Sequence, residues 1–275
     1  MTARTRSIRP LPVLSAGAGP PLVLLGGFAL APTAYRPTVE ALSRSWSVTV
    51  PDLFPLRPLR EAWSAERICA RLRAALDARR LDGITLVSHS FGTALALQVV
   101  ARDPGRFEAL VVASSSGLSE RLGMLSSASV GFRVLGAASP GAVWAFARNA
   151  LAQPISLLRA GSWAFFRDAD ETLRRVAASG VPVHVLWAAD DSFVRRVDGE
   201  RFAAKVGASF HVASDPSRAR PVDHGWVYRH PALFERTLAA ALAASAPDRL
   251  PSSTKSGARP VPAASLGAAG RNGSC

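Results

Sequence analysis

The sequence contains little lysine and little cysteine. Lys205 and Lys255 are the only lysines among its 33 basic residues, and Cys69 and Cys275 are the only cysteines. Two cysteines form neither a disulfide framework nor the paired CxxC spacing of a zinc site, so no metal is expected. The scarcity of cysteine favours a reducing compartment, and we expect a cytoplasmic protein.

Long apolar runs are also missing. No segment reaches the ~20 uninterrupted apolar residues of a membrane span, so stable membrane insertion is not expected. The apolar run at residues 21–31 follows Arg4, Arg6 and Arg9, and this order is similar to that of a secretion signal. Prolines and glycines interrupt the segment between the arginines and the run, which favours a central strand. Secretion is therefore the alternative to a cytoplasmic location.

Acidic residues are few, 20 against 33 basic ones, and the formal net charge is +13. A charge of this sign can indicate nucleic-acid binding. The arginines are scattered, however, and their longest runs are pairs such as Arg79–Arg80. A nucleic-acid surface would gather them on one face, so no nucleic-acid partner is predicted.

What the sequence does contain is an alternation of short apolar runs and segments of helical periodicity. The expected strands are 7–15, 22–25, 46–50, 84–87, 107–113, 181–187 and 209–212; the expected helices are 32–43, 61–80, 93–102, 168–178, 196–206 and 231–244. This alternation predicts one α/β domain over residues 1–245. Residues 117–165 break the rhythm and are predicted to be a helical insertion. Residues 246–275 are rich in Pro, Ser, Gly and Ala, and we expect them to be disordered.

Ser90 lies where a buried strand meets a helix, in the segment Ser88-His89-Ser90-Phe91-Gly92. A serine hydroxyl needs a base, an acid that orients the base, and donors for the oxyanion before it becomes a good nucleophile. The small residues on both sides suit the sharp turn of the G-x-S-x-G nucleophile motif, with Ser88 in place of the first glycine. The competing interpretation is a serine that caps the following helix.

Two acids and a histidine follow Ser90 in an informative order. Asp190 and Asp191 come just after an apolar strand, and His224 lies in a later loop before the last helix. The order Ser, Asp, His is that of the α/β-hydrolase nucleophile motif. Either acid could orient His224 on this argument alone.

On these residues, positions 10–245 resemble the α/β-hydrolase superfamily. Many members read W-G-x-x-D after a strand, and the segment Trp187 to Asp191 matches this pattern with Ala188 in place of glycine. Many members also have a proline seven residues after the histidine, as Pro231 stands here after His224. The resemblance implies an α/β-hydrolase fold with a mostly parallel sheet, helices on both faces and a helical lid. It also implies Asp191 as the acid, with Asp190 as the alternative.

The remaining polar residues near these motifs are predicted to be structural. Some relatives carry the acid after the preceding strand, but residues 114–116 are serines here. Asp223 is interpreted as a loop residue, and the His89 side chain is expected to point away from the site. His184 is expected in the core, and His211 and His230 on the surface.

The oxyanion donors are expected to be two backbone N–H groups. One belongs to Phe91, which follows the nucleophile. The resemblance implies Phe28 as the second donor, with Ala29 as the alternative. Relatives often have His-Gly at this turn, whereas this chain has Gly26-Gly27, so a histidine that often braces the loop is missing.

The insertion is rich in aromatic residues. Trp144, Phe146 and Trp163, together with Phe165 and Phe166, suit an apolar acyl pocket, although they equally suit burial against the sheet domain. The arginines of the insertion are interpreted as a solvated face, with a substrate carboxylate or phosphate as the alternative; they are Arg121, Arg133, Arg148 and Arg159.

Three functional hypotheses follow. The first is a serine hydrolase of the esterase or thioesterase type, which cleaves a small ester or thioester with an apolar acyl group through an acyl-Ser90 intermediate. The second uses the same three residues for C–C bond hydrolysis, lyase or acyl-transfer chemistry on a small metabolite. The third is a non-catalytic binding protein on the same scaffold. None of them requires a cofactor, and the oligomeric state stays open.

Overall fold

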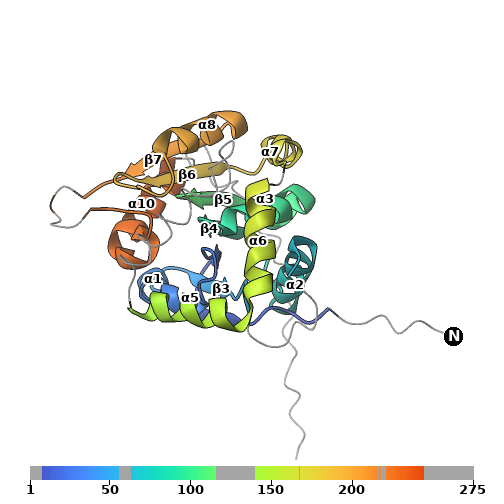
Figure 1. Cartoon of the computed structure of the whole chain (residues 1–275). Coiled ribbons are helices and arrows are strands. Elements are labelled where there is room, and N and C mark those ends of the chain that lie inside the picture. The colour runs from blue at the N-terminus through green and yellow to red at the C-terminus, as the bar shows by residue number, and fades with distance from the viewer. Residues whose placement is uncertain are drawn as a thin grey trace, which may run out of the picture. The chain divides into compact units, whose positions relative to one another are not determined.

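A mostly parallel sheet forms the centre of the computed structural model (Figure 1). The structure describes residues 8–55, 63–115, 140–166, 168–215, 217 and 221–244. Residues 1–245 form one compact unit. The predicted tail at 246–275 and the first part of the predicted insertion, 117–139, lie outside the described residues.

The described sheet has seven strands in the order β1-β3-β2-β4-β5-β6-β7. Their bounds are β1 Val13–Ala16, β2 Pro21–Leu25, β3 Ser47–Pro51, β4 Ile84–His89, β5 Phe107–Ala113, β6 Val183–Ala188 and β7 Ser209–Ala213. Only β1 is antiparallel to its neighbour, β3; the other pairs are parallel. The carboxyl ends of β2 to β7 therefore meet at one edge of the sheet, where ligands bind in open α/β sheets.

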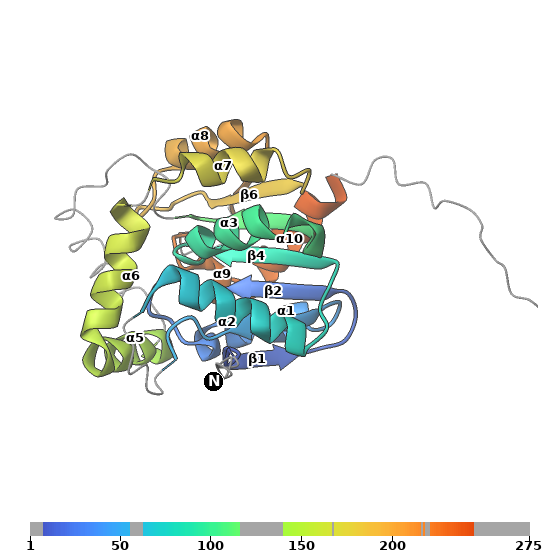
Figure 2. The ribbon, with the colours of Figure 1, turned by 90° about the vertical axis from the view of Figure 1, so that its right-hand side faces the viewer.

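Helices cover both faces of the sheet (Figure 2). One face carries α2 Ala65–Ala78, α3 Gly92–Arg102, α7 Asp170–Ala177 and α8 Arg196–Val206. The opposite face carries α1 Arg36–Leu42, α9 Trp226–Arg229 and α10 Pro231–Ala244. Short 3-10 helices lie at Pro32–Tyr35 (η1) and Pro104–Arg106 (η2).

The central strands are buried because they are covered on both sides. Every residue of β4 and of β6 is buried, which explains why these segments read as continuous apolar runs rather than alternating ones. One apolar cluster lies on each face of the sheet: the first includes Leu72, Leu95 and Trp187, and the second includes Leu24 and Phe234. The predicted α/β fold with a mostly parallel sheet is confirmed.

The insertion leaves the sheet after β5 and returns before β6. Its described part consists of α5 Pro140–Ala152 and α6 Pro154–Phe166, separated by Gln153. Both helices lie beyond the carboxyl ends of the parallel strands (Figure 2). The predicted first strand is shorter than expected, since it begins at Val13, and it is an edge strand. Within the described residues, no helix is long and apolar enough to cross a membrane.

Gly92 is the residue that lets α3 approach the sheet. A Cβ atom built there would lie 2.4 Å from the backbone oxygen of Leu25 on β2. We expect Gly92→Ala to lower the free energy of unfolding by about 2 kcal/mol or more, because backbone cannot yield as a side chain can. Urea denaturation measures this, with Gly105→Ala as the control, because a Cβ at the exposed Gly105 meets nothing within 4 Å. Equal stabilities of the two variants would contradict this account.

Candidate active site

Ser90 occupies a strained turn between β4 and α3. Its φ angle is 53°, in the left-handed region that residues other than glycine rarely adopt. The Ser90 N–H donates to the Ala113 carbonyl on β5 at 3.1 Å, and the Ser90 carbonyl accepts from the Thr93 N–H at 3.1 Å. These two hydrogen bonds, one at the N–H and one at the carbonyl of Ser90, hold the backbone in this conformation. Backbone strain of this type is found at functional sites.

Ser88 replaces the first glycine of the motif without disturbing the turn. It is fully buried, and its hydroxyl donates to the Val111 carbonyl at 3.2 Å. The Thr93 hydroxyl lies 3.1 Å from the Ser88 hydroxyl oxygen and is placed to donate to it. The extra polar atom of Ser88 is therefore satisfied inside the core.

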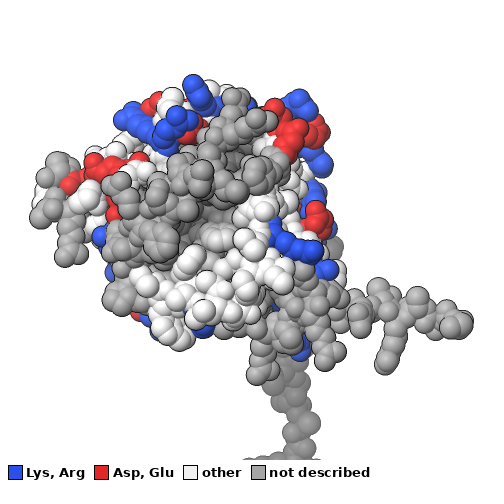
Figure 3. Space-filling model, viewed as in Figure 1, with Lys and Arg blue, Asp and Glu red and all other residues white. Residues whose placement is uncertain are grey.

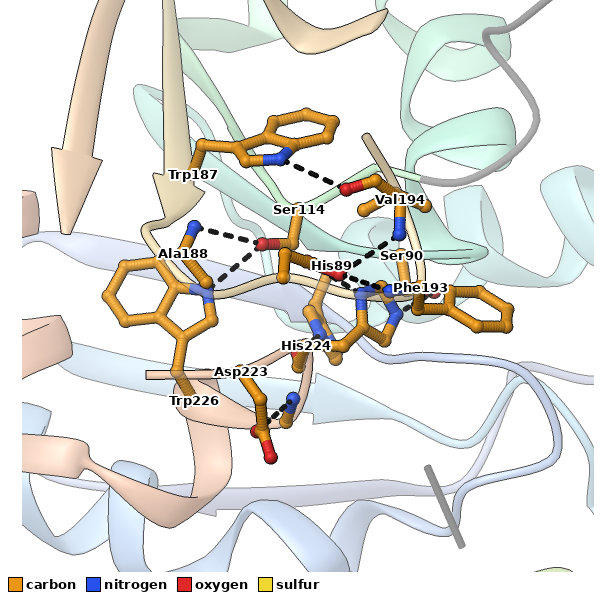
Figure 4. Close-up of polar contacts among 12 residues, drawn as sticks. His89, Ser90, Ser114, Trp187, Ala188, Phe193, Val194, Asp223, His224 and Trp226 are labelled. Atoms are coloured by element: carbon orange, nitrogen blue, oxygen red, sulfur yellow. Dashed lines mark hydrogen bonds and ion pairs between the residues drawn. The ribbon is translucent and has the colours of Figure 1, made fainter. Parts of the chain in front are cut away.

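The side chains of Ser90, His224 and Asp191 form one hydrogen-bonded row (Figure 4 labels Ser90 and His224). The Ser90 Oγ lies 2.9 Å from His224 Nε2, and His224 Nδ1 lies 3.0 Å from Asp191 Oδ2. In the arrangement that satisfies all atoms, the serine hydroxyl donates to Nε2 and the Nδ1–H donates to the carboxylate. The three residues come from three different loops at the carboxyl edge of the sheet.

Asp191 is held as a carboxylate. Burial of its side chain, which is 1% exposed, acts to raise its pKa, but the adjacent His224 and two backbone donors outweigh burial and lower the pKa. The donors are the N–H groups of Phe193 and Val194, each 2.9 Å from Asp191 Oδ1. The Phe193 ring also packs on the imidazole of His224, with centroids 4.6 Å apart. The imidazole of His224 is thus oriented from two sides.

The alternative acid does not contact His224. Asp190 Oδ2 accepts from the Val222 N–H at 2.9 Å, so its carboxylate ties two loops together.

Ser114, at the end of β5, is also structural in its contacts: its hydroxyl accepts from the Ala188 N–H at 3.3 Å and from Trp226 Nε1–H at 3.1 Å. Asp223 forms an ion pair with Arg229, as suits a loop residue.

Phe28 and Phe91, the residues expected to donate to the oxyanion, lie side by side, and Phe91 directly follows Ser90. Their rings pack edge to face, with centroids 5.5 Å apart. In the part of the chain that the structure describes, neither backbone N–H donates a hydrogen bond. Ala29, the alternative donor, has a φ angle of 58°, and its carbonyl accepts from Asn149 Nδ2 on α5 at 2.7 Å.

The aromatic residues of the insertion are divided between the site and the solvent. Trp163 on α6 packs against Phe91, with ring centroids 6.4 Å apart, and Phe146 is partly buried against the main core. Trp144 differs from the expectation: it is 64% exposed and lies beside the Arg148 guanidinium. The side chains of Phe165 and Phe166 lie outside the described residues, as do Arg121 and Arg133.

Trp144 on α5 is one of the exposed apolar residues of the insertion, and Figure 3 shows few charged atoms where α5 lies in Figure 1. Other large apolar residues exposed on α5 and α6 are Val143, Leu151, Ile155 and Leu158. Helical periodicity alone could not show which face of α5 would be turned outward. Arg159, on α6, is exposed.

Sequence reasoning missed two aromatic residues near the nucleophile, Phe54 and Trp63. Both are buried, and their rings lie 5.4 Å and 6.0 Å from the Phe91 ring. Phe54 follows β3 by three residues, and its place at the carboxyl edge of a parallel strand was the available signal. Asp52 in the same loop accepts from the Phe54 N–H at 3.0 Å, and burial raises its pKa.

The other histidines follow the expectations in part. His184 is buried in β6, as expected, and burial lowers its pKa. His230 was expected on the surface but is only 4% exposed, because it lies between the packed helices α9 and α10; His211 is partly buried. His89 points away from Ser90 but its Nε2 reaches the main-chain oxygen of His224 at 3.0 Å, so it does contact the site. Among the described residues, no group of His, Cys, Asp or Glu is placed to hold a metal ion.

A family model for the α/β-hydrolase fold matches residues 20–153 of the chain. A 2-hydroxy-6-oxo-2,4-heptadienoate hydrolase from Pseudomonas putida is 38% identical over 113 residues, which cover 38% of this chain and 41% of that protein. A 2-hydroxymuconate semialdehyde hydrolase from Pseudomonas sp. is 31% identical over 110 residues, or 38% of this chain and 39% of that protein. The matched segment thus spans about two fifths of these relatives.

Among solved structures, a bromoperoxidase from Bacillus anthracis superposes with a TM-score of 0.67. The match covers 84% of this chain and 94% of that protein at 17% sequence identity. At this identity the likeness concerns the fold alone.

The contacts of the two acids predict different effects on the reactivity of Ser90. Asp191→Asn should slow its reaction with a fluorophosphonate by roughly 10³–10⁴-fold, because an amide no longer holds the Nδ1–H form of His224. Asp190→Asn should react at close to the wild-type rate, because its amide oxygen still accepts from Val222. Time-resolved intact mass measures both rates. A larger loss in Asp190→Asn would make Asp190 the acid.

Burial of His89 predicts a pH dependence of stability. Burial lowers the pKa of His89 to about 3, whereas a histidine in the unfolded chain has a pKa of about 6.5. Between these values the unfolded chain binds a proton that the folded chain does not, so the free energy of unfolding falls as the pH falls.

We expect His89→Gln to flatten the dependence of the unfolding free energy on pH in this window, as measured by urea denaturation. Tyr228→Phe is the control, because burial raises the pKa of Tyr228 to about 12 and it does not titrate there. Equal slopes in wild type and His89→Gln would contradict a neutral, buried His89.

Proposed function

Because the chain belongs to the α/β-hydrolase superfamily, we propose that it is a serine hydrolase that breaks a bond to a carbonyl carbon through an acyl-Ser90 intermediate. The observation that carries this proposal is the row of hydrogen bonds from Ser90 Oγ through His224 to the buried carboxylate of Asp191. A serine that is only a helix cap needs no such partners.

The residues suit the two halves of such a reaction. His224 Nε2 takes the Ser90 proton as the oxygen attacks the carbonyl, and then delivers it to the leaving group. The N–H groups of Phe28 and Phe91 face the oxyanion that forms on the carbonyl oxygen. Asp191 keeps His224 in the required form and stabilises its charged state. Water then attacks the acyl group with His224 again as the base.

For the bond itself, we propose the carbon–carbon bond beside the ketone or aldehyde carbonyl of a small conjugated oxo acid. Support comes from the two sequence relatives, whose names describe hydrolases of such compounds. In this reaction the acyl carbon gains the oxygen of water, and the departing carbon must gain a proton. A conjugated oxo acid can take up the electron pair of the broken bond as an enol, which makes carbon a feasible leaving group.

Ester or thioester hydrolysis is the second candidate, because the same side chains serve it with only the leaving group changed. The apolar surroundings of the nucleophile favour it: Phe54, Trp63, Phe91 and Trp163 form a continuous aromatic cluster. Such a cluster suits an apolar acyl group. Acyl transfer would differ by leaving the acyl group on an acceptor other than water, and lyase chemistry would add no water across the broken bond.

The first experiment tests for an activated serine. Purified protein treated with a fluorophosphonate should gain the mass of one adduct, and peptide mapping should place it on Ser90. Ser90→Ala should gain none, and His224→Ala should react about 10³-fold more slowly or worse, because the base is lost. His211→Ala, a partly buried histidine on β7, is the control and should react at the wild-type rate. A folded wild type that forms no adduct would favour the binding-protein hypothesis.

The second experiment distinguishes the two candidates. The enzyme is given 2-hydroxy-6-oxo-2,4-heptadienoate and, separately, p-nitrophenyl butyrate, in water enriched in oxygen-18. Carbon–carbon hydrolysis predicts a higher kcat/KM for the oxo acid, with one heavy oxygen in the released carboxylic acid. A higher kcat/KM for the ester would make the esterase the correct assignment. An acylated acceptor in place of the free acid would indicate acyl transfer.

A further inference from the structure

A second row of hydrogen bonds runs behind the three proposed catalytic residues. The Gly27 N–H donates to the Tyr35 hydroxyl oxygen at 2.6 Å, and this oxygen lies 2.8 Å from His89 Nδ1. On the other side of the imidazole, His89 Nε2 lies 3.0 Å from the main-chain oxygen of His224. Four residues from four separate segments are thus joined end to end.

The chemistry of the end groups gives this row one direction. The His224 carbonyl can only accept, so the proton of a neutral His89 must be on Nε2. Nδ1 is then an acceptor. The Gly27 N–H can only donate, so the Tyr35 oxygen accepts from it and has its own proton free to donate to Nδ1. Every polar atom of the row is satisfied in this single arrangement.

Burial keeps both side chains of the row neutral. Tyr35 is fully buried and His89 is 1% exposed. Burial, and then the nearby His224, lower the pKa of His89 to about 3, against the opposing effects of the His224 carbonyl and Asp191. Burial likewise raises the pKa of Tyr35. Neither residue is therefore a candidate for proton transfer in the reaction.

The two ends of the row lie at the two functional parts of the site. Gly27 directly precedes Phe28, whose N–H is a proposed oxyanion donor. His224 is the proposed base, and its ring packs beside that of His89 with centroids 5.2 Å apart (Figure 4). The turn after β2 begins with Gly26 and Gly27, which have no side chains that could hold it. The Tyr35 hydroxyl accepts a hydrogen bond from the backbone of this turn, at the Gly27 N–H.

We propose that Tyr35 and His89 are positioning residues that join the oxyanion turn to the backbone of the base through one directed row of hydrogen bonds. This inference rests on the proposed function of Ser90 and His224. The row sets the distance between the donor that binds the oxyanion and the base that moves the proton. An error of about 1 Å in such a distance costs roughly 10²-fold in rate.

Tyr228 provides a matched control for this proposal. Its ring packs against both Tyr35 and His89, with centroids 5.7 Å and 6.0 Å away, and it is buried. Within the described residues its hydroxyl takes no part in the row. Loss of the Tyr228 hydroxyl therefore changes the packing around Tyr35 and His89 without removing a hydrogen bond of the row from Gly27 to His224.

The first test separates kcat from KM. Tyr35→Phe should lower kcat by about 10–100-fold with KM changed less than about threefold, since the row acts on reacting groups rather than on substrate binding. Tyr228→Phe should stay within about twofold of wild type in both constants. His89→Leu should resemble Tyr35→Phe, and the double variant should cost no more than the worse single variant, because each change breaks the same row. Additive losses, or an unchanged kcat in Tyr35→Phe, would overturn the proposal.

The second test does not depend on activity. Nitrogen-15 NMR of histidine-labelled protein should show the neutral Nε2–H form of His89 down to about pH 4, because its pKa is about 3. Tyr35→Phe, checked for folding by circular dichroism, should keep the Nε2–H form, because the His224 carbonyl still accepts from it. Its Nδ1 resonance should shift, because Nδ1 loses the Tyr35 hydroxyl as a donor. An Nδ1–H or charged imidazole in wild type at pH 7 would overturn the directed row. If the NMR result holds but no fluorophosphonate adduct forms, the row exists and the proposed function is what fails.

Discussion

The strained turn at Ser90 is the constraint on which the site depends. Ser90, the proposed nucleophile, contacts His224 from a backbone that takes a positive φ between β4 and α3. That turn requires α3 to start against the backbone of β2, which Gly92 permits. It also requires β5 to lie alongside, since the Ala113 carbonyl holds the Ser90 N–H. The parallel order of β2, β4 and β5 is thus a condition for the position of Ser90 beside His224.

The same edge of the sheet supplies the other parts. Asp191 follows β6, the proposed oxyanion turn follows β2, and His224 comes from the loop before α9. Polar contacts tie these loops to their neighbours, such as the partly buried contact of Asp190 with Val222 and the buried contact of Asn149 with Ala29. Preorganisation of this kind matters because donors that are already aimed at the developing charge need no reorganisation during the reaction.

Local pattern predicted the parts that depend on chain order. The buried run before Ser90, the acids after Trp187 and the spacing of His224 and Pro231 are readable because strand, turn and helix follow directly in the sequence. The Tyr35–His89 contact spans 54 residues and depends on side-chain packing from both elements, so no pattern could reveal it. The outward face of Trp144 and the burial of His230 escaped prediction for the same reason: helical periodicity does not say which neighbours will cover a face.

The central claim is that Ser90 carries the acyl group during turnover. Rapid acid quenching of the enzyme with excess oxo acid or ester, followed by intact mass and peptide mapping, tests this directly. The account predicts an acyl adduct on the peptide that contains Ser90, formed and consumed at least as fast as the steady-state kcat. Turnover with no adduct at any quench time, or with an adduct on another residue, would contradict it.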